Sequence, residues 1–166
     1  KSRIIKTNNR INSENYKNLQ LIKINLRIKD ILKKLSKKIR SLKLNINQNQ
    51  FECLSPSDFN IRNILTSSKK FYFIDFEYSG IDNYHKLMLD FICQPDILFD
   101  QKEIEVIINE FSKINHNLKN NFDRSLIVLN SIKWFYLILN SNYNNKFSKL
   151  QIFKSIKYFK ERIAEY

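Results

Sequence analysis

The sequence predicts an α+β fold that is mainly α, and three observations carry this prediction. Apolar residues recur at steps of three and four over a long first segment, which is the spacing of an amphipathic helix. A central stretch of short apolar runs between turn residues favours strands. Beyond Gly80, the single glycine, four more segments have helical patterns. With 166 residues and two prolines, the chain suits one compact domain and excludes a collagen-like class.

The first part of the chain is predicted to be a flexible basic segment followed by a long helix. Residues 1–13 are polar and have no apolar periodicity. Residues 14–166 are expected to form a single domain that begins with a helix over residues 14–44. One face of this helix carries Leu21, Ile24, Ile28, Ile31, Leu35, Ile39 and Leu42. The polar run at residues 45–50 ends the pattern.

The centre of the chain has the composition of a small β-structure. Three short strands are expected there, over residues 51–54, 61–65 and 71–74. Pro56 biases Ser55 toward an extended conformation, so the segment that follows the first strand is predicted to be a loop. Residues 66–70 have the composition of a hairpin loop between the second and third strands.

The remainder of the chain is predicted to be helical. Helices are expected over residues 84–93, 101–114, 122–139 and 147–164. The third is apolar on nearly all sides, which predicts a central core helix. Its fully apolar run, Trp134–Leu139, has six residues, far short of the roughly 20 needed to span a bilayer. Because the N-terminal residues are charged and polar, we expect no secretory signal and a cytoplasmic protein.

The positive charge is concentrated in the first third of the chain. Residues 1–50 hold 14 Lys and Arg against two acidic residues, whereas residues 51–166 hold 15 against 14. A basic first helix can bind nucleic acid or an anionic membrane, or it can pack on a core with a solvated lysine face. Tyr16 is the only aromatic residue among the first 50, so bases of single-stranded nucleic acid lack a stacking platform. We therefore favour the core-packing interpretation.

Two carboxylates and one amide are predicted to gather at one end of the central hairpin. Asp58 and Asn63 are five residues apart on the segment that leads into the second strand, and Asp75 follows the third. If these strands pair as a hairpin, the ends that bear Asn63 and Asp75 lie side by side. Carboxylate and amide oxygens suit Mg²⁺, which takes substrate phosphates and water as its other ligands. The pattern therefore predicts a magnesium site.

The residues around this group resemble the motifs of the aminoglycoside phosphotransferase and choline kinase family, which has a protein-kinase-like fold. The family loop reads roughly H-G-D-x-x-x-x-N-[IL]-L and its second motif reads I-D-[FW]-E. The matching residues here are Asp58-Phe-Asn-Ile-Arg-Asn63-Ile-Leu65 and Ile74-Asp-Phe-Glu77. Asp82 and residues 87–91 resemble the acidic helical segment after the second motif, and residues 132–140 resemble a helix of one branch. The resemblance covers roughly residues 50–140.

The resemblance implies the C-terminal lobe of a phosphotransferase, with its catalytic centre within residues 51–80. Asp58 would orient the substrate hydroxyl and accept its proton. Asn63 and Asp75 would hold Mg²⁺ on the phosphates of ATP, and Asp90 would support the fold. The implied activity is ATP-dependent phosphorylation of a hydroxyl on a small molecule, such as a sugar, an aminoglycoside or an amino alcohol.

Two departures from the family pattern limit this expectation. Pro56 stands where the family has a histidine that braces the loop. The sequence has no Gly-rich phosphate loop, and only 57 residues precede Asp58, so we expect the nucleotide-binding N-terminal lobe to be absent. The isolated chain should then bind Mg-ATP weakly and turn over very slowly, if at all. Two alternatives stay open: a non-catalytic kinase-like remnant or accessory domain, and a basic helical domain that binds nucleic acid.

Overall fold

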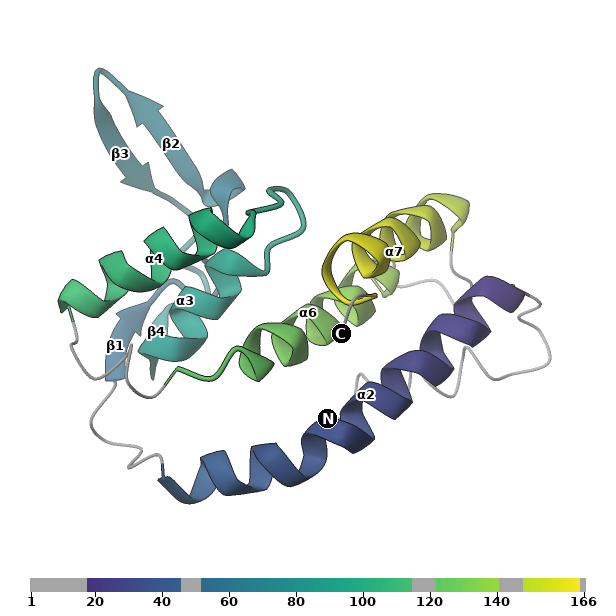
Figure 1. The fold of residues 1–166 in the computed structure, drawn as a ribbon. Coiled ribbons are helices and arrows are strands. Elements are labelled where there is room, and N and C mark those ends of the chain that lie inside the picture. The colour runs from purple at the N-terminus through teal and green to yellow at the C-terminus, as the bar shows by residue number, and fades with distance from the viewer. Residues whose placement is uncertain (1–17, 46–51, 115–121, 141–147, 165–166) are drawn as a thin grey trace. The chain divides into compact units, whose positions relative to one another are not determined.

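The structure is a computed structural model that describes residues 18–45, 52–114, 122–140 and 148–164, with only the backbone for residues 37–45. The elements in chain order are α2 (Leu19–Asn45), β1 (Glu52–Ser55), the 3-10 helix η2 (Ile61–Asn63), β2 (Ile64–Ser67), β3 (Lys70–Phe73), β4 (Gly80–Asn83), α3 (Tyr84–Ile92), α4 (Gln101–Ile114), α6 (Ser125–Leu139) and α7 (Lys149–Arg162) (Figure 1). The predicted α+β, mainly α, class is confirmed. The flexible segment predicted over residues 1–13 lies outside the described residues.

None of the described helices combines the length and apolar character needed to cross a membrane.

The contacts divide the chain into two compact units. Lys1–Asn45 and Val128–Tyr166 form one, which we call the helical unit, and Ile46–Ile127 form the other, which we call the strand unit. The helical unit contains α2, most of α6, and α7. The strand unit contains the four described strands together with α3 and α4.

Helix α2 has the amphipathic face that its sequence predicts. It begins at Leu19 because the Oδ1 atom of Asn18 accepts hydrogen bonds from the backbone N–H groups of Gln20 and Leu21, at 3.1 and 3.2 Å. Residues 14–17 of the predicted helix lie outside the described part of the chain. The predicted apolar face is buried over its described side chains, Leu21, Ile24, Ile28, Ile31 and Leu35.

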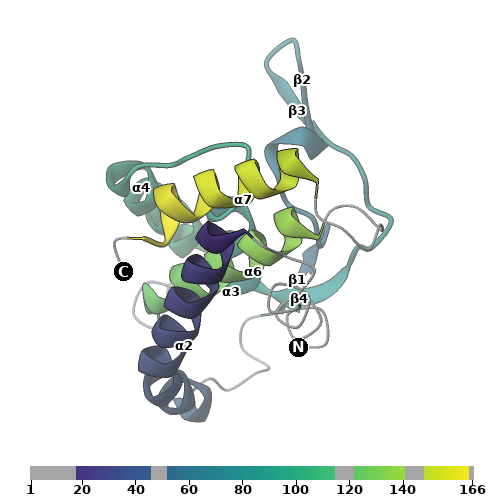
Figure 2. The ribbon, with the colours of Figure 1, turned by 90° about the vertical axis from the view of Figure 1, so that its right-hand side faces the viewer.

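Helix α6 supplies the centre of the helical unit, as its apolar sequence predicts. It lies beside α2 and α7 (Figure 2). Its buried residues belong to one core with those of α2 and α7: Val128, Ile132, Phe135, Tyr136 and Leu139. The predicted start at residue 122 is wrong by three residues. The helix begins at Ser125 because the Oδ1 atom of Asp123 accepts a hydrogen bond from the Ser125 N–H at 2.7 Å.

Helix α7 begins with a capping box. The Ser148 hydroxyl accepts from the Gln151 N–H at 3.1 Å, and the Gln151 side chain accepts from the Ser148 N–H at 2.7 Å. Farther along, Tyr158 and Phe159 are buried in the core. The helix therefore has a fixed start and one face anchored in the helical unit.

The strand unit contains a strand that the sequence interpretation missed. The helix expected over residues 84–93 is present as α3, but no strand was expected before it, and Gly80–Asn83 forms β4, which pairs antiparallel with β1. Asp82 therefore lies in a strand, and the expectation that it belongs to a helical segment is wrong. Strand pairing depends on a distant partner, in this case β1, so a local pattern does not reveal it.

The predicted hairpin is present with shifted boundaries. Strands β2 and β3 pair antiparallel, with Ile64 opposite Phe73 and Ser67 opposite Lys70. The expected strand over residues 61–65 begins only at Ile64, because the three preceding residues form η2. The expected five-residue loop is a tight turn at Ser68 and Lys69, which both have positive φ.

Helices α3 and α4 complete the strand unit and pack on each other. The Asn83 side chain caps α3 by accepting from the His85 N–H at 2.8 Å. Asp100 and Glu103 exchange backbone-to-side-chain hydrogen bonds at the start of α4, at 2.7 and 2.8 Å. The bounds predicted for α4 are confirmed at both ends.

Candidate functional site

Two loops that carry the predicted site residues are held together at both of their ends. The first, residues 56–63, runs from β1 to β2, and the second, residues 74–79, runs from β3 to β4. At one end Ser55 pairs with Gly80 in the β1–β4 ladder. At the other end the Ile74 N–H donates to the Asn63 carbonyl oxygen at 2.9 Å, next to the β2–β3 ladder. The two loops are therefore bracketed between the two ladders (Figure 1).

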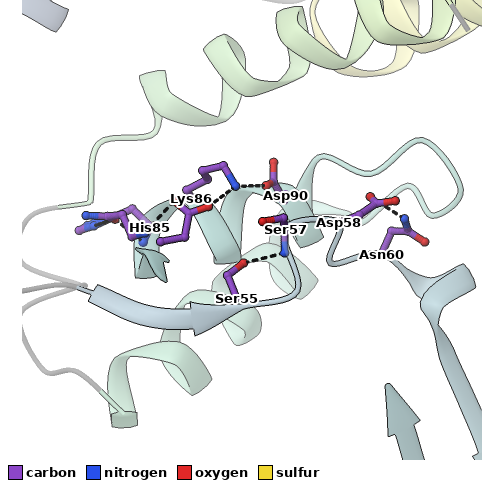
Figure 3. A network of polar contacts seen from close by, with 9 residues as sticks. Ser55, Ser57, Asp58, Asn60, His85, Lys86 and Asp90 are labelled. Carbon is purple, nitrogen blue, oxygen red and sulfur yellow. Dashed lines mark hydrogen bonds and ion pairs between the residues drawn. The ribbon is translucent and has the colours of Figure 1, made fainter. Parts of the chain in front are cut away.

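Local hydrogen bonds shape the first loop. The Ser57 N–H donates to the Ser55 hydroxyl at 3.0 Å, and the Asn60 side-chain amide donates to a carboxylate oxygen of Asp58 at 2.8 Å (Figure 3). The Asn60 N–H also donates to the Asp58 carbonyl oxygen at 3.0 Å. Asn60 is buried and Asp58 is half-buried, so the bonds between them are partly shielded from solvent. The Asp58 carboxylate is therefore held in one orientation by a buried amide.

Asp58 and Asn63 are brought together, as the sequence predicts. The Asn63 amide nitrogen lies 3.0 Å from the Asp58 carbonyl oxygen and 3.4 Å from its carboxylate Oδ2 atom. Because the nitrogen end of this amide faces Asp58, its Oδ1 oxygen is directed elsewhere. Asn60 helps to place Asn63 by capping η2, since its Oδ1 atom accepts from the Arg62 N–H at 2.9 Å.

The first loop is anchored to α3 and to the hairpin. The Ile61 N–H donates to the side-chain oxygen of Gln94 at 2.8 Å, and Gln94 is fully buried just after α3. The Phe59 ring stacks on Phe91 of α3 at 4.9 Å between centroids and contacts Phe73 of β3 at 5.8 Å. These contacts fix the loop in relation to the strand that leads to Asp75.

Asp75 lies one residue beyond the Ile74–Asn63 hydrogen bond, so its backbone is close to that of Asn63. The predicted side-by-side placement of the two strand ends is confirmed at the level of the backbone. Asp75 is exposed and has φ of 64°, and Ser57 on the other loop has φ of 63°. Both residues occupy the left-handed region, which is costly for residues other than glycine and is enriched at functional sites.

The donor set at the ends of these loops suits a hard divalent cation. The two Asp58 carboxylate oxygens receive amide hydrogen bonds, whereas the Asn63 Oδ1 atom and the Asp75 carboxylate are the oxygen groups of the predicted magnesium site. Mg²⁺ is commonly bound by one or two such groups together with substrate phosphates. Across the described residues, no group of three or more His, Cys, Asp and Glu side chains has an arrangement that holds a metal ion. The predicted magnesium site is not a group of this type, because one of its three residues, Asn63, is an amide.

A charged cluster lies beside the first loop, where β4 meets α3. Lys86 contacts the Asp82 carboxylate at 2.5 Å. It also contacts the Asp90 carboxylate at 3.1 Å (Figure 3). Asp90 is buried, as expected for a residue that supports the fold. Burial acts to lower the pKa of Lys86, but the hydrogen bonds and charges of the two carboxylates outweigh burial and raise it. The cluster therefore keeps Lys86 charged.

Sequence reasoning missed two residues that shape the site. Asn60 orients Asp58 and caps η2. Gln94, which is 33 residues after Ile61 in the sequence, accepts a hydrogen bond from the Ile61 N–H and so anchors the first loop. The tendency of asparagine to begin helical turns is a signal that points to Asn60. Gln94 has no such signal, because its partner is remote in sequence.

Comparison with protein-family models, curated proteins and solved structures finds no match to the chain.

Proposed function

We propose that the strand unit is the catalytic part of a Mg²⁺-dependent phosphotransferase that transfers the γ-phosphoryl group of ATP to a hydroxyl of a small molecule. The main support is the hydrogen-bonded pair of Asp58 and Asn63, placed beside the Asp75 backbone by the two ladders. The order, spacing and loop positions of these residues are those of the phosphotransferase motifs that the sequence resembles.

In this proposal each residue has a distinct role. Asp58, oriented by two amides, positions the acceptor hydroxyl and takes its proton. Asn63 and Asp75 hold Mg²⁺, which supplies positive charge to the phosphates of ATP. Ser57 stands where the resembling motif has glycine, and its φ of 63° is the conformation that glycine adopts easily.

The acidic residues near the site favour a neutral or singly charged acceptor. Asp82 pairs with Lys86, Asp96 pairs with Arg62, and Asp100 caps α4. Since these carboxylates are engaged, few remain to bind a polycation such as an aminoglycoside. A sugar or an amino alcohol fits the proposal better.

The exposed surface of the hairpin supports a kinase-like C-terminal lobe that another lobe covers. Leu65, Phe71 and Tyr72 are 51%, 69% and 50% exposed, although all three are large and apolar or aromatic. Exposed apolar patches of this kind mark surfaces that bind a partner. A nucleotide-binding lobe over this hairpin is therefore part of the proposal.

Nucleotide binding gives the first test. We expect the chain to bind a fluorescent ATP analogue weakly and only with Mg²⁺. Asp75→Asn should abolish the Mg²⁺-dependent part, since it removes a charged ligand, whereas Asp58→Asn should leave binding intact. Asp30→Asn in the helical unit is the matched control, because Asp30 is an exposed carboxylate in surface ion pairs. Binding that is unaffected by Asp75→Asn would refute the metal role and favour the non-catalytic remnant.

Turnover gives the second test. A screen of hydroxyl acceptors with radiolabelled ATP identifies a substrate, and Asp58→Asn is then expected to lower kcat by about 10²–10⁴-fold, the usual contribution of a general base. Asp30→Asn should leave kcat unchanged. Equal and measurable kcat values for Asp58→Asn and the unmodified chain would refute the assignment of Asp58. A robust turnover number for the chain alone would contradict the expected need for a second lobe.

A further inference from the structure

The outward face of α7 combines apolar side chains with lysines. Leu150 and Phe153 are 60% and 65% exposed. Phe153 lies four residues from both Lys149 and Lys157, and Leu150 lies four residues from Lys154, so these five side chains share one surface of the helix. All three lysines are exposed. We call these five residues the α7 face.

The α7 face is not needed for packing within the helical unit. The opposite side of the helix supplies Tyr158 and Phe159 to the core, and Ser155 is fully buried. The capping box at Ser148 fixes the start of the helix. The apolar side chains of the face are therefore presented to solvent on a helix that is already folded.

The charge of the chain is strongly uneven between the two units. The described residues of the helical unit include 15 Lys and Arg and two acidic residues. Those of the strand unit include seven Lys and Arg and twelve acidic residues. On α2 the exposed basic side chains include Lys23, Lys29 and Lys33. This imbalance gives the helical unit a positive field that attracts an anionic surface.

We propose that the α7 face binds the surface of anionic lipid bilayers. Exposed apolar residues set among lysines on one side of a helix are typical of helices that lie in the membrane interface. Leu150 and Phe153 would enter the headgroup region, while Lys149, Lys154 and Lys157 would contact the acidic headgroups. This function is independent of the proposed phosphoryl transfer.

Nucleic acid is the other polyanion that a basic helical unit attracts, and the α7 face suits it less well. Phosphates of a duplex bind cations, and they leave exposed apolar side chains without a partner. Single strands require several aromatic side chains for stacking, and Phe153 is the one aromatic residue of this face. The two apolar residues therefore favour a bilayer.

Vesicle co-sedimentation of the full chain tests the proposal. We expect binding to vesicles of phosphatidylcholine with phosphatidylserine, little binding to phosphatidylcholine alone, and weaker binding as salt is raised. Leu150→Ser with Phe153→Ser should lower the affinity by about tenfold for each side chain. Lys154→Gln with Lys157→Gln should lower it by about fivefold for each lysine. All four side chains are exposed, so the variants should fold normally.

Helix α4 of the acidic strand unit provides matched controls. Val106→Ser with Ile114→Ser removes two side chains that are 58% and 68% exposed. Lys102→Gln with Lys113→Gln removes two lysines, one of which pairs with Glu110 as Lys157 pairs with Glu161. Each control should change the affinity by less than about twofold.

Three results would overturn the proposal. The first is the absence of binding to the phosphatidylserine vesicles. The second is equal binding by the unmodified chain and the Leu150→Ser, Phe153→Ser variant, or an equal loss in the α4 controls. The third is binding to a DNA or RNA duplex, without vesicle binding, that the lysine variant weakens and the apolar variant does not, which would assign the face to nucleic acid.

Discussion

The buried side chain of Gln94 holds the backbone N–H of Ile61 at 2.8 Å, across 33 residues of sequence. The other end of the same amide donates to the Phe91 carbonyl oxygen at 2.9 Å, so Gln94 has a partner at both ends. One side chain thus connects the end of α3 with η2, the 3-10 helix that leads to Asn63. The position of the candidate site therefore depends on a residue outside the two motif loops.

Gln94→Ala should loosen the first loop. The substitution leaves the Ile61 N–H without its acceptor and opens a cavity, which should lower the free energy of unfolding by about 2 kcal/mol. Chemical denaturation measures this loss, and hydrogen exchange at the Ile61 amide should become faster. Gln20→Ala, at an exposed position of α2, is the control and should have little effect. Unchanged exchange at Ile61 would show that Gln94 does not hold the loop.

Lys86→Ala should destabilise the strand unit by about 2 kcal/mol, because the buried carboxylate of Asp90 loses the ammonium group that it contacts. The loss should be smaller than for a fully buried pair, since the Lys86 side chain is 42% exposed. Lys113→Ala is the matched control. Lys113 pairs with Glu110 where both side chains are largely exposed, so its removal should cost less than about 0.5 kcal/mol. Urea denaturation curves that coincide for the two variants would contradict the role assigned to Lys86.

Ser57→Gly should stabilise the protein by about 0.5–1 kcal/mol. The left-handed backbone conformation of Ser57, with φ of 63°, has a higher free energy for serine than for glycine. Removing this strain stabilises the folded state by more than the added flexibility of glycine stabilises the unfolded chain. Ser79→Gly, in the second loop at a residue without positive φ, should instead destabilise slightly. Thermal unfolding of both variants checks the prediction. A lower Tm for Ser57→Gly than for Ser79→Gly would show that the Ser57 conformation is not strained.

His85 should make stability depend on pH. Burial lowers the pKa of His85 below its ordinary value of 6.5, so the unfolded chain binds a proton more readily than the folded one. The contribution of neutral His85 to the free energy of unfolding is therefore fully present above pH 6.5. It is lost as the pH falls below that value toward the folded-state pKa of His85. Within this window stability should fall with falling pH, at a slope below the limit of about 1.4 kcal/mol per pH unit for one proton.

Denaturation at several pH values, with the unmodified chain and with His85→Asn, measures this dependence. The variant should have a flatter profile below pH 6.5, because asparagine does not titrate. Profiles of equal slope would assign the pH dependence to other groups.

The sequence alone predicted which segments are helical and part of the candidate site. The apolar spacing of α2 predicted its buried face, and the composition of α6 predicted its place in the core. The spacing of Asp58 and Asn63 also predicted their proximity, because they are five residues apart on one loop and its last three residues form a 3-10 turn. Helical faces and short loops follow from interactions between near neighbours, which a sequence pattern records directly.

Only the tertiary structure decided which distant segments meet. It paired Ser55 with Gly80, formed β4 where no strand was expected, and placed the Gln94 amide on Ile61. It also left Leu150 and Phe153 exposed on α7 although both are apolar. The physical reason is that ladder hydrogen bonds and buried polar contacts gain their energy from partners far away in the chain, so the residues on either side alone do not specify them.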